Sequence, residues 1–131
     1  MDNIVIGPSG IYLIDSNSVG GAIDKVLSVL MLNENLSMVG CLKDILEKLK
    51  IVSELVKSNN VLKKALKPAL CFTNARVNLQ PDEHADGVLV VSLKNLMGNI
   101  SKAPVILETS DIRSACALIL DGAEYASCRK N

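Results

Sequence analysis

The chain has 131 residues, and its 14 basic and 14 acidic side chains give a formal net charge of zero at pH 7. Hydrophobic residues make up 49% of the chain and aromatic residues only 2%, so we expect an aliphatic core in a single domain over residues 1–131. A net charge of zero argues against attraction of polyanions to the whole surface, and the apolar runs are too short to span a membrane. We therefore expect a cytoplasmic protein with no membrane partner.

Two apolar runs near the N-terminus, residues 3–6 and 11–14, are rich in β-branched residues and predict a β-hairpin. The four residues between them include two glycines and one proline, which are typical of a tight turn. We expect the second strand to end at Asp15. A turn-rich connector over residues 16–21 follows, and residues 26–32 predict one or two further strands.

From Met38 onward the apolar side chains recur every three or four residues, which predicts a long helix with one buried face. Ser37 is the expected N-cap of this helix. Charged residues elsewhere on the helix have the spacing of ion pairs across one helical turn, which indicates a solvated surface. The expected pairs are Asp44 with Lys48, Glu47 with Lys50, and Glu54 with Lys57.

The C-terminal half of the chain predicts helices and strands in alternation. The expected elements are a helical turn at residues 61–66, strands at 69–72 and 88–91, a short helix at 93–100, and a last helix capped by Thr109 or Ser110. Pro68 is expected to end the helical turn. The complete order predicts an α/β fold with one mixed β-sheet flanked by helices.

The cysteines and the single histidine, His84, do not have the spacing of a zinc site, because the chain contains no CxxC pair. Cys41, Cys71 and Cys116 lie among apolar residues, and we expect their thiols to be buried and unreactive. His84 lies in a polar stretch and is expected to be a solvated loop residue.

Two carboxylates stand at the ends of the predicted hairpin. Asp2 opens its first strand and Asp15 closes the second, so the turn would bring the two side chains together. Paired carboxylates suit a hard cation such as Mg²⁺ or Mn²⁺, which can activate water and stabilise a phosphoryl transition state. The alternative is that both aspartates only shape the hairpin, because aspartate is a common turn residue.

The segment from Asp2 to Asn17 reads DNIVIGPSGIYLIDSN and resembles the central motif of the nuclease-related domain (NERD) family. That motif is Asp, an apolar strand, Gly-Pro-x-Gly, an apolar strand, then Asp or Glu, any residue, and Lys. Residues 66–72 and 87–96 resemble the family's C-terminal half in pattern. The resemblance implies the PD-(D/E)xK, restriction-endonuclease-like fold, in which both acidic residues bind metal and the lysine helps to activate water.

The motif departs from the family at Asn17, which occupies the place of the lysine. An amide carries no charge and cannot stabilise developing phosphorane charge. The resemblance therefore implies a catalytically impaired, degenerate domain that binds nucleic acid or protein, with a weak Mg²⁺ or Mn²⁺ site at Asp2 and Asp15. One alternative is an active Mg²⁺-dependent DNA nuclease whose lysine comes from elsewhere, Lys25 being nearest. Another is a structural or assembly module.

Two further features concern partners. Lys63, Lys64 and Lys67 have no acidic neighbours at helical spacing, which makes them the candidate contacts to DNA phosphates. The restriction-endonuclease-like core normally has a helix before its first catalytic strand, and we expect this chain to lack it. Such a core would leave an apolar sheet face or strand edge uncovered, so we expect a homo-oligomer.

Overall fold

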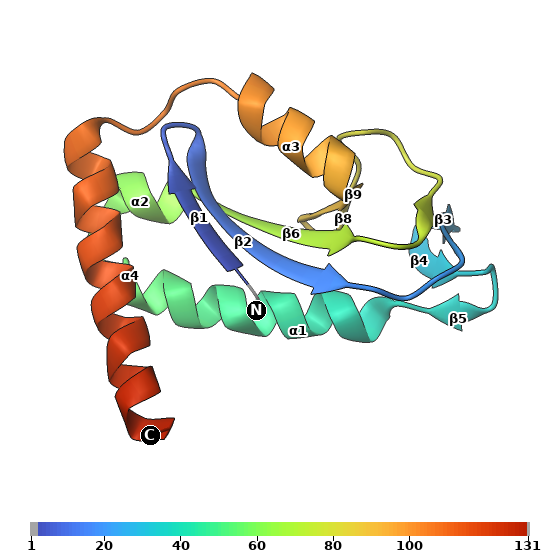
Figure 1. Ribbon diagram of the computed structural model, residues 1–131, viewed down its shortest axis with the longest axis horizontal. Helices are drawn as coiled ribbons and strands as arrows, with labels where there is room; N and C mark the ends of the chain where they lie inside the picture. Colours follow the sequence, from blue (N-terminus) through green and yellow to red (C-terminus); the bar gives the residue numbers. More distant parts are fainter. Residues whose placement is uncertain (1–2, 131) are drawn as a thin grey trace.

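The computed structural model describes the backbone of residues 3–130 and the side chains of residues 3–120. Its strands are β1 (Asn3–Gly7), β2 (Gly10–Asn17), β3 (Ala22–Val26), β4 (Val29–Leu32), β5 (Leu36–Ser37), β6 (Leu66–Phe72), β7 (Arg76–Val77), β8 (His84–Ala85) and β9 (Val88–Ser92). Its helices are α1 (Val39–Leu55), α2 (Asn60–Lys64), α3 (Leu93–Lys102) and α4 (Thr109–Lys130). The fold is α/β, with two mixed β-sheets on which the helices pack (Figure 1).

The larger sheet has the strand order β1-β2-β6-β9-β8. The predicted hairpin is confirmed, because β1 and β2 pair in antiparallel fashion from Asn3 opposite Ile14 to Gly7 opposite Gly10. Strands β2, β6 and β9 run parallel to one another, and β8 returns antiparallel to β9. Parallel neighbours require a crossover connection, and α1 and α2 lie in the crossover from β2 to β6.

The two faces of this sheet are covered by different helices, with α1 below and α3 above in Figure 1. Successive side chains of a strand point to opposite faces. On β2, Ile11 and Leu13 are therefore packed in a cluster with residues of α1, α2 and α4. Tyr12 and Ile14 are packed on the other face in a cluster with residues of α3. Helix α3 thus lies on the face opposite α1.

The sequence predicts a single sheet, but the structure also has a second, smaller sheet, whose strand order is β5-β4-β3-β7. The region expected as one or two strands is a hairpin, with β3 antiparallel to β4. Its turn is at Leu27 and Ser28, whose φ angles of 50° and 69° are in the left-handed region. Neither residue favours that region, so the sequence carries no clear signal for the reversal.

The long predicted helix is confirmed as α1, which begins one residue later than expected. Met38 is the N-cap, and Ser37 Oγ accepts a hydrogen bond from the amide of Val39. Pro68 does not separate a helix from a strand, because it lies inside β6 opposite Leu13. The pairing of β6 with β9 starts only at Ala69, so the proline removes no hydrogen bond on that side.

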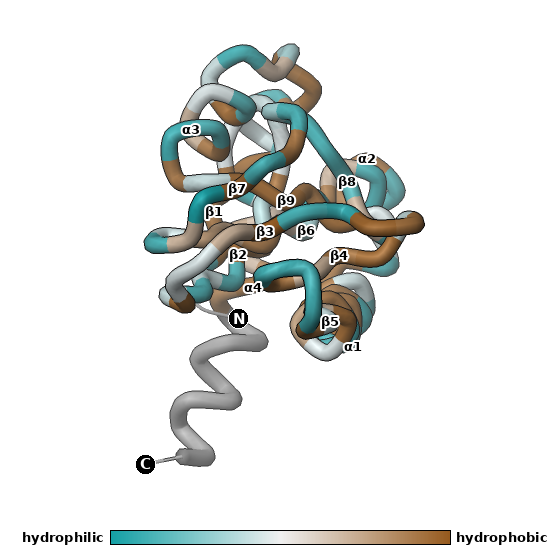
Figure 2. The backbone as a smooth tube through the Cα atoms, turned by 90° about the vertical axis from the view of Figure 1, so that its right-hand side faces the viewer, coloured by the Kyte–Doolittle hydropathy of each residue, from teal (hydrophilic) through white to brown (hydrophobic). Residues whose placement is uncertain are grey.

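The interior of the molecule is aliphatic, as the composition predicts. In Figure 2, hydrophobic segments lie near β6 and β9 in the middle of the view, and α1 at its lower edge has both hydrophobic and hydrophilic parts. The largest fully buried side chain is Phe72, and the others of this group are isoleucine, leucine and valine. Within the described part of the chain, no helix is both long and apolar enough to cross a membrane.

Candidate functional site

Asp15 lies near the C-terminal end of β2, on the face of the sheet covered by α1. Strand β2 extends to Asn17, two residues beyond the predicted end, so Asp15 and Asn17 continue the series of Ile11 and Leu13. The side chain of Asp15 is only 14% exposed. Asp2 lies outside the described residues, so its predicted approach to Asp15 stays a prediction.

Lys48 of α1 is the cation that lies beside Asp15. Its Nζ donates a hydrogen bond to Asp15 Oδ2 at 3.3 Å, and the lysine side chain is 38% exposed. The prediction that Lys48 pairs with Asp44 is therefore wrong, whereas the predicted pair of Glu54 and Lys57 is confirmed at 3.1 Å. Helix α1 thus turns this lysine toward the sheet and away from the solvated surface that its spacing indicates.

Asn17 also faces α1, but its amide is engaged by other groups. Its Oδ1 accepts a hydrogen bond from the amide of Val19 at 2.9 Å, and its Nδ2 donates to Cys41 Sγ at 3.7 Å. The side chain therefore supports the turn after β2 and contacts the start of α1. It brings no charge to the carboxylate of Asp15.

These residues surround a shallow pocket of about 210 Å³, which we call the Asp15 pocket. It is lined by Asp15, Ser16 and Asn17 of β2, Cys41, Asp44 and Lys48 of α1, and Leu70 of β6. The lining contains two carboxylates and one ammonium group. Asp44 and Lys48 are the residues that sequence reasoning missed. Their positions relative to Cys41 follow helical spacing, which could have indicated a common face.

The described donors of the Asp15 pocket do not fit the Mg²⁺ ion that the NERD resemblance implies. Mg²⁺ requires near-octahedral oxygen ligands at about 2.0–2.1 Å. Among the side chains of residues 3–120, no three histidine, cysteine, aspartate or glutamate residues are grouped so that they could hold a metal ion. An ammonium group already contacts the most suitable carboxylate of the pocket.

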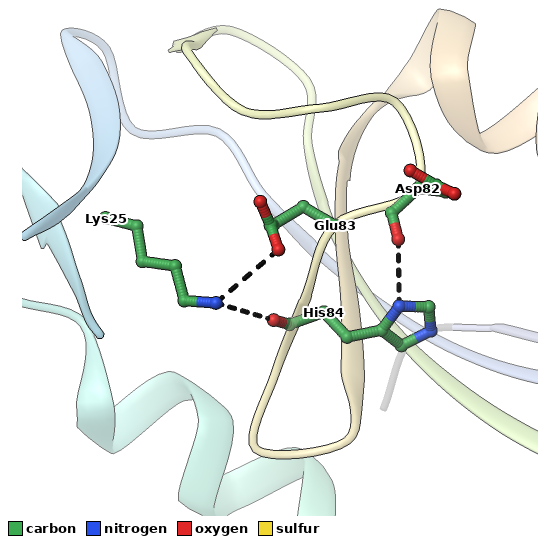
Figure 3. A network of polar contacts seen from close by, with 4 residues as sticks. All are labelled: Lys25, Asp82, Glu83 and His84. Atoms are coloured by element: carbon green, nitrogen blue, oxygen red, sulfur yellow. Dashed lines mark hydrogen bonds and ion pairs between the residues drawn. The ribbon is translucent and has the colours of Figure 1, made fainter.

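Lys25, the lysine that the active-nuclease alternative names as nearest in sequence, lies in a different network (Figure 3). Its Nζ donates to the main-chain oxygen of His84 at 3.0 Å and to Glu83 Oε2 at 3.5 Å. The ring Nδ1 of His84 donates in turn to the main-chain oxygen of Asp82 at 2.9 Å. Lys25 therefore ties the smaller sheet to the segment at the start of β8, whereas Lys48 is the lysine that contacts Asp15.

The three candidate DNA-binding lysines have different surroundings. Lys63 and Lys64 are exposed in the last turn of α2. Lys67 is half-buried on β6, where its Nζ donates to the main-chain oxygen of Ser9 at 2.8 Å and lies 5.4 Å from the ring centroid of Tyr12. A phosphate contact by Lys67 would compete with these interactions, whereas Lys63 and Lys64 are accessible.

The cysteines are free thiols in the described part of the chain. Cys71 is buried on β6 as predicted, and this burial raises the pKa of its thiol by desolvation, which disfavours the reactive thiolate. Cys41 and Cys116 are half-buried rather than fully buried. Only Cys41 of the three lines the Asp15 pocket.

Comparisons of the chain with known families, with curated proteins and with solved structures find no match in any of the three.

Proposed function

We propose that the chain is a nuclease-like module that has lost metal-dependent cleavage and acts by binding nucleic acid. The observation that carries the proposal is the ion pair between Lys48 and Asp15, together with the neutral Asn17 two residues further along the same strand. Asp15 is the carboxylate that the NERD motif assigns to metal. In this structure Asp15 Oδ2 instead accepts a hydrogen bond from the ammonium group of Lys48.

The arrangement of the larger sheet supports a restriction-endonuclease-like core. Its motif lies on the β1–β2 hairpin, α1 lies in the crossover to the parallel strand β6, and helices lie on both faces. The motif carboxylate is found near the end of a central strand and beside a helix. Such a position can present a site to a polymeric substrate.

The loss of cleavage follows from the charges at the site. Removing one transition-state donor commonly lowers kcat by about 10²–10³-fold, and Asn17 provides no charge in place of the motif's lysine. A carboxylate that is held by Lys48 is also a poorer metal ligand. Binding of nucleic acid through the outer surface requires neither a lysine at position 17 nor a metal ion at Asp15.

The close approach of Lys48 also favours a second candidate function. In this alternative the chain is a metal-dependent nuclease, and Lys48 supplies the charge that Asn17 lacks. The two candidates make opposite statements about DNA cleavage, so one assay separates them.

We expect plasmid and single-stranded DNA to remain intact when they are incubated with the protein and Mg²⁺ or Mn²⁺, as measured on denaturing gels. The variants Asp15→Asn and Lys48→Met should behave in the same way. Lys50→Met is the matched control, because Lys50 is an exposed lysine of α1 outside the Asp15 pocket. Cleavage that persists in Lys50→Met but disappears in the other two variants would establish the second candidate.

Binding to DNA should depend on Lys63 and Lys64. For the double variant Lys63→Ala/Lys64→Ala, we expect weaker binding to a labelled duplex. The slope of the logarithm of the binding constant against the logarithm of salt concentration should become shallower by the equivalent of about two phosphate contacts. Fluorescence anisotropy across a salt series measures both quantities. The control is Lys57→Ala, which removes a lysine already paired with Glu54. If the wild-type protein shows no salt-dependent binding, the nucleic-acid proposal is wrong.

A further inference from the structure

We infer that Lys48 is the resident cation of the Asp15 pocket and that it keeps divalent metal ions out. The inference rests on the proposed function in one respect, namely that the Asp15 pocket corresponds to the metal site of the NERD motif. It adds a specific role for a residue that lies outside that motif. It also explains how the charge of the Asp15 carboxylate can be balanced when no metal ion is bound, because Lys48 pairs with it.

The distances show why the ammonium and a metal ion compete. Lys48 Nζ lies 3.3 Å from Asp15 Oδ2. An Mg²⁺ ion bound to the same oxygen at about 2.1 Å would lie within a few ångström of the ammonium. Two cations at such a separation repel each other, and solvent screens the repulsion only in part, because Asp15 is 14% exposed and Lys48 is 38% exposed.

The main-chain position of Lys48 is fixed by the packing of its helix. Ile45, one turn earlier on α1, is fully buried, and Val52, one turn later, is 3% exposed. These residues anchor α1 against the larger sheet in two different clusters of the core. The helix therefore cannot rotate to withdraw the lysine, and a metal ion could enter only by displacing the ammonium.

Without the ammonium group, the pocket still holds two carboxylates, and water molecules would have to supply the other ligands of a divalent ion. Asp15 and Asp44 both line it, and carboxylate oxygens are the ligands that Mg²⁺ and Mn²⁺ prefer. Replacing Lys48 with methionine keeps a long apolar side chain on α1 but leaves two carboxylates without this positive charge. The variant should therefore gain a binding site that the wild-type protein lacks.

The test is titration of the intact chain with Mn²⁺, with the free ion measured by electron paramagnetic resonance. We expect no uptake by the wild-type protein or by the control Lys50→Met. Lys48→Met should bind one ion at least about tenfold more tightly than the wild-type protein. The added site should disappear in Lys48→Met/Asp15→Asn, and Lys48→Arg should exclude the ion as the wild-type protein does.

Two results would overturn the inference. One is uptake of an ion by the wild-type protein that is lost in Asp15→Asn, and the other is no gain of affinity in a folded Lys48→Met. Circular dichroism establishes folding, and Lys48→Gln replaces the methionine variant if that variant does not fold. Wild-type protein that binds Mn²⁺ without cutting DNA refutes this inference alone, whereas DNA cleavage refutes the proposed function.

Discussion

Replacing Phe72 with alanine is expected to lower the free energy of unfolding by about 3–5 kcal/mol, a large share of the about 5–15 kcal/mol that is typical of a folded domain. The phenylalanine ring is 1% exposed at the end of the central strand β6. It is packed in one cluster with Ile45 of α1 and Val90 of β9. No other phenylalanine or tryptophan is present to fill the space, so truncation should leave a cavity.

Urea denaturation followed by circular dichroism measures this change. Phe72→Leu conserves most of the apolar volume and should cost less than about 1.5 kcal/mol. Met97 of α3 is 63% exposed, so Met97→Ala should change the stability by no more than about 0.5 kcal/mol. A loss below about 1 kcal/mol in Phe72→Ala would show that the cluster between α1 and the larger sheet is not the main core.

In solution, multi-angle light scattering should give about twice the 14.0 kDa mass of the chain. The expected interface is the outer edge of β1, which pairs only with β2 in the described part of the chain. Its sequence, NIVIG, contains no charged residue to discourage pairing with another strand. Two copies of β1 could pair in antiparallel fashion about a two-fold axis, which is the commonest closed symmetry.

Val5 is the residue with which to test this interface. It lies in the middle of β1 and is 40% exposed. Val5→Lys should place a charge at the edge in each copy and raise the dissociation constant of the dimer by at least about tenfold. Val61→Lys makes the same change at a similarly exposed site on α2 and should leave the dimer intact. A wild-type chain that remains monomeric at high micromolar concentration would contradict the prediction.

Elements with a strong local signal could be predicted from the sequence. The hairpin of β1 and β2 follows from β-branched runs around a Gly-Pro-Ser-Gly turn, and α1 follows from an apolar stripe with regular spacing. Each of these two signals lies within its own short segment of the chain. The turn of the β3–β4 hairpin has no such signal, because Leu27 and Ser28 adopt φ angles that their side chains do not favour.

The site was predicted only in part, because its parts come from distant segments. The motif places Asp15 and Asn17 two residues apart on one strand, and the structure shows that both contact residues of α1. The identity of the neighbouring lysine depends on how α1 crosses the sheet, which periodicity does not determine. Helical spacing assigned Lys48 to Asp44 on the solvated surface, whereas tertiary packing brings it to Asp15.

The parallel pairing of β2 with β6 has a consequence for how quickly the chain can fold. Residues 11–17 must find residues 66–72, with β3, β4 and β5 of the smaller sheet and two helices in the intervening segment. Closing a long loop costs chain entropy before the contacts that repay it have formed. The larger sheet should therefore assemble on the millisecond-to-second scale that is typical of nonlocal topologies. The β1–β2 hairpin and α1 can form locally within microseconds.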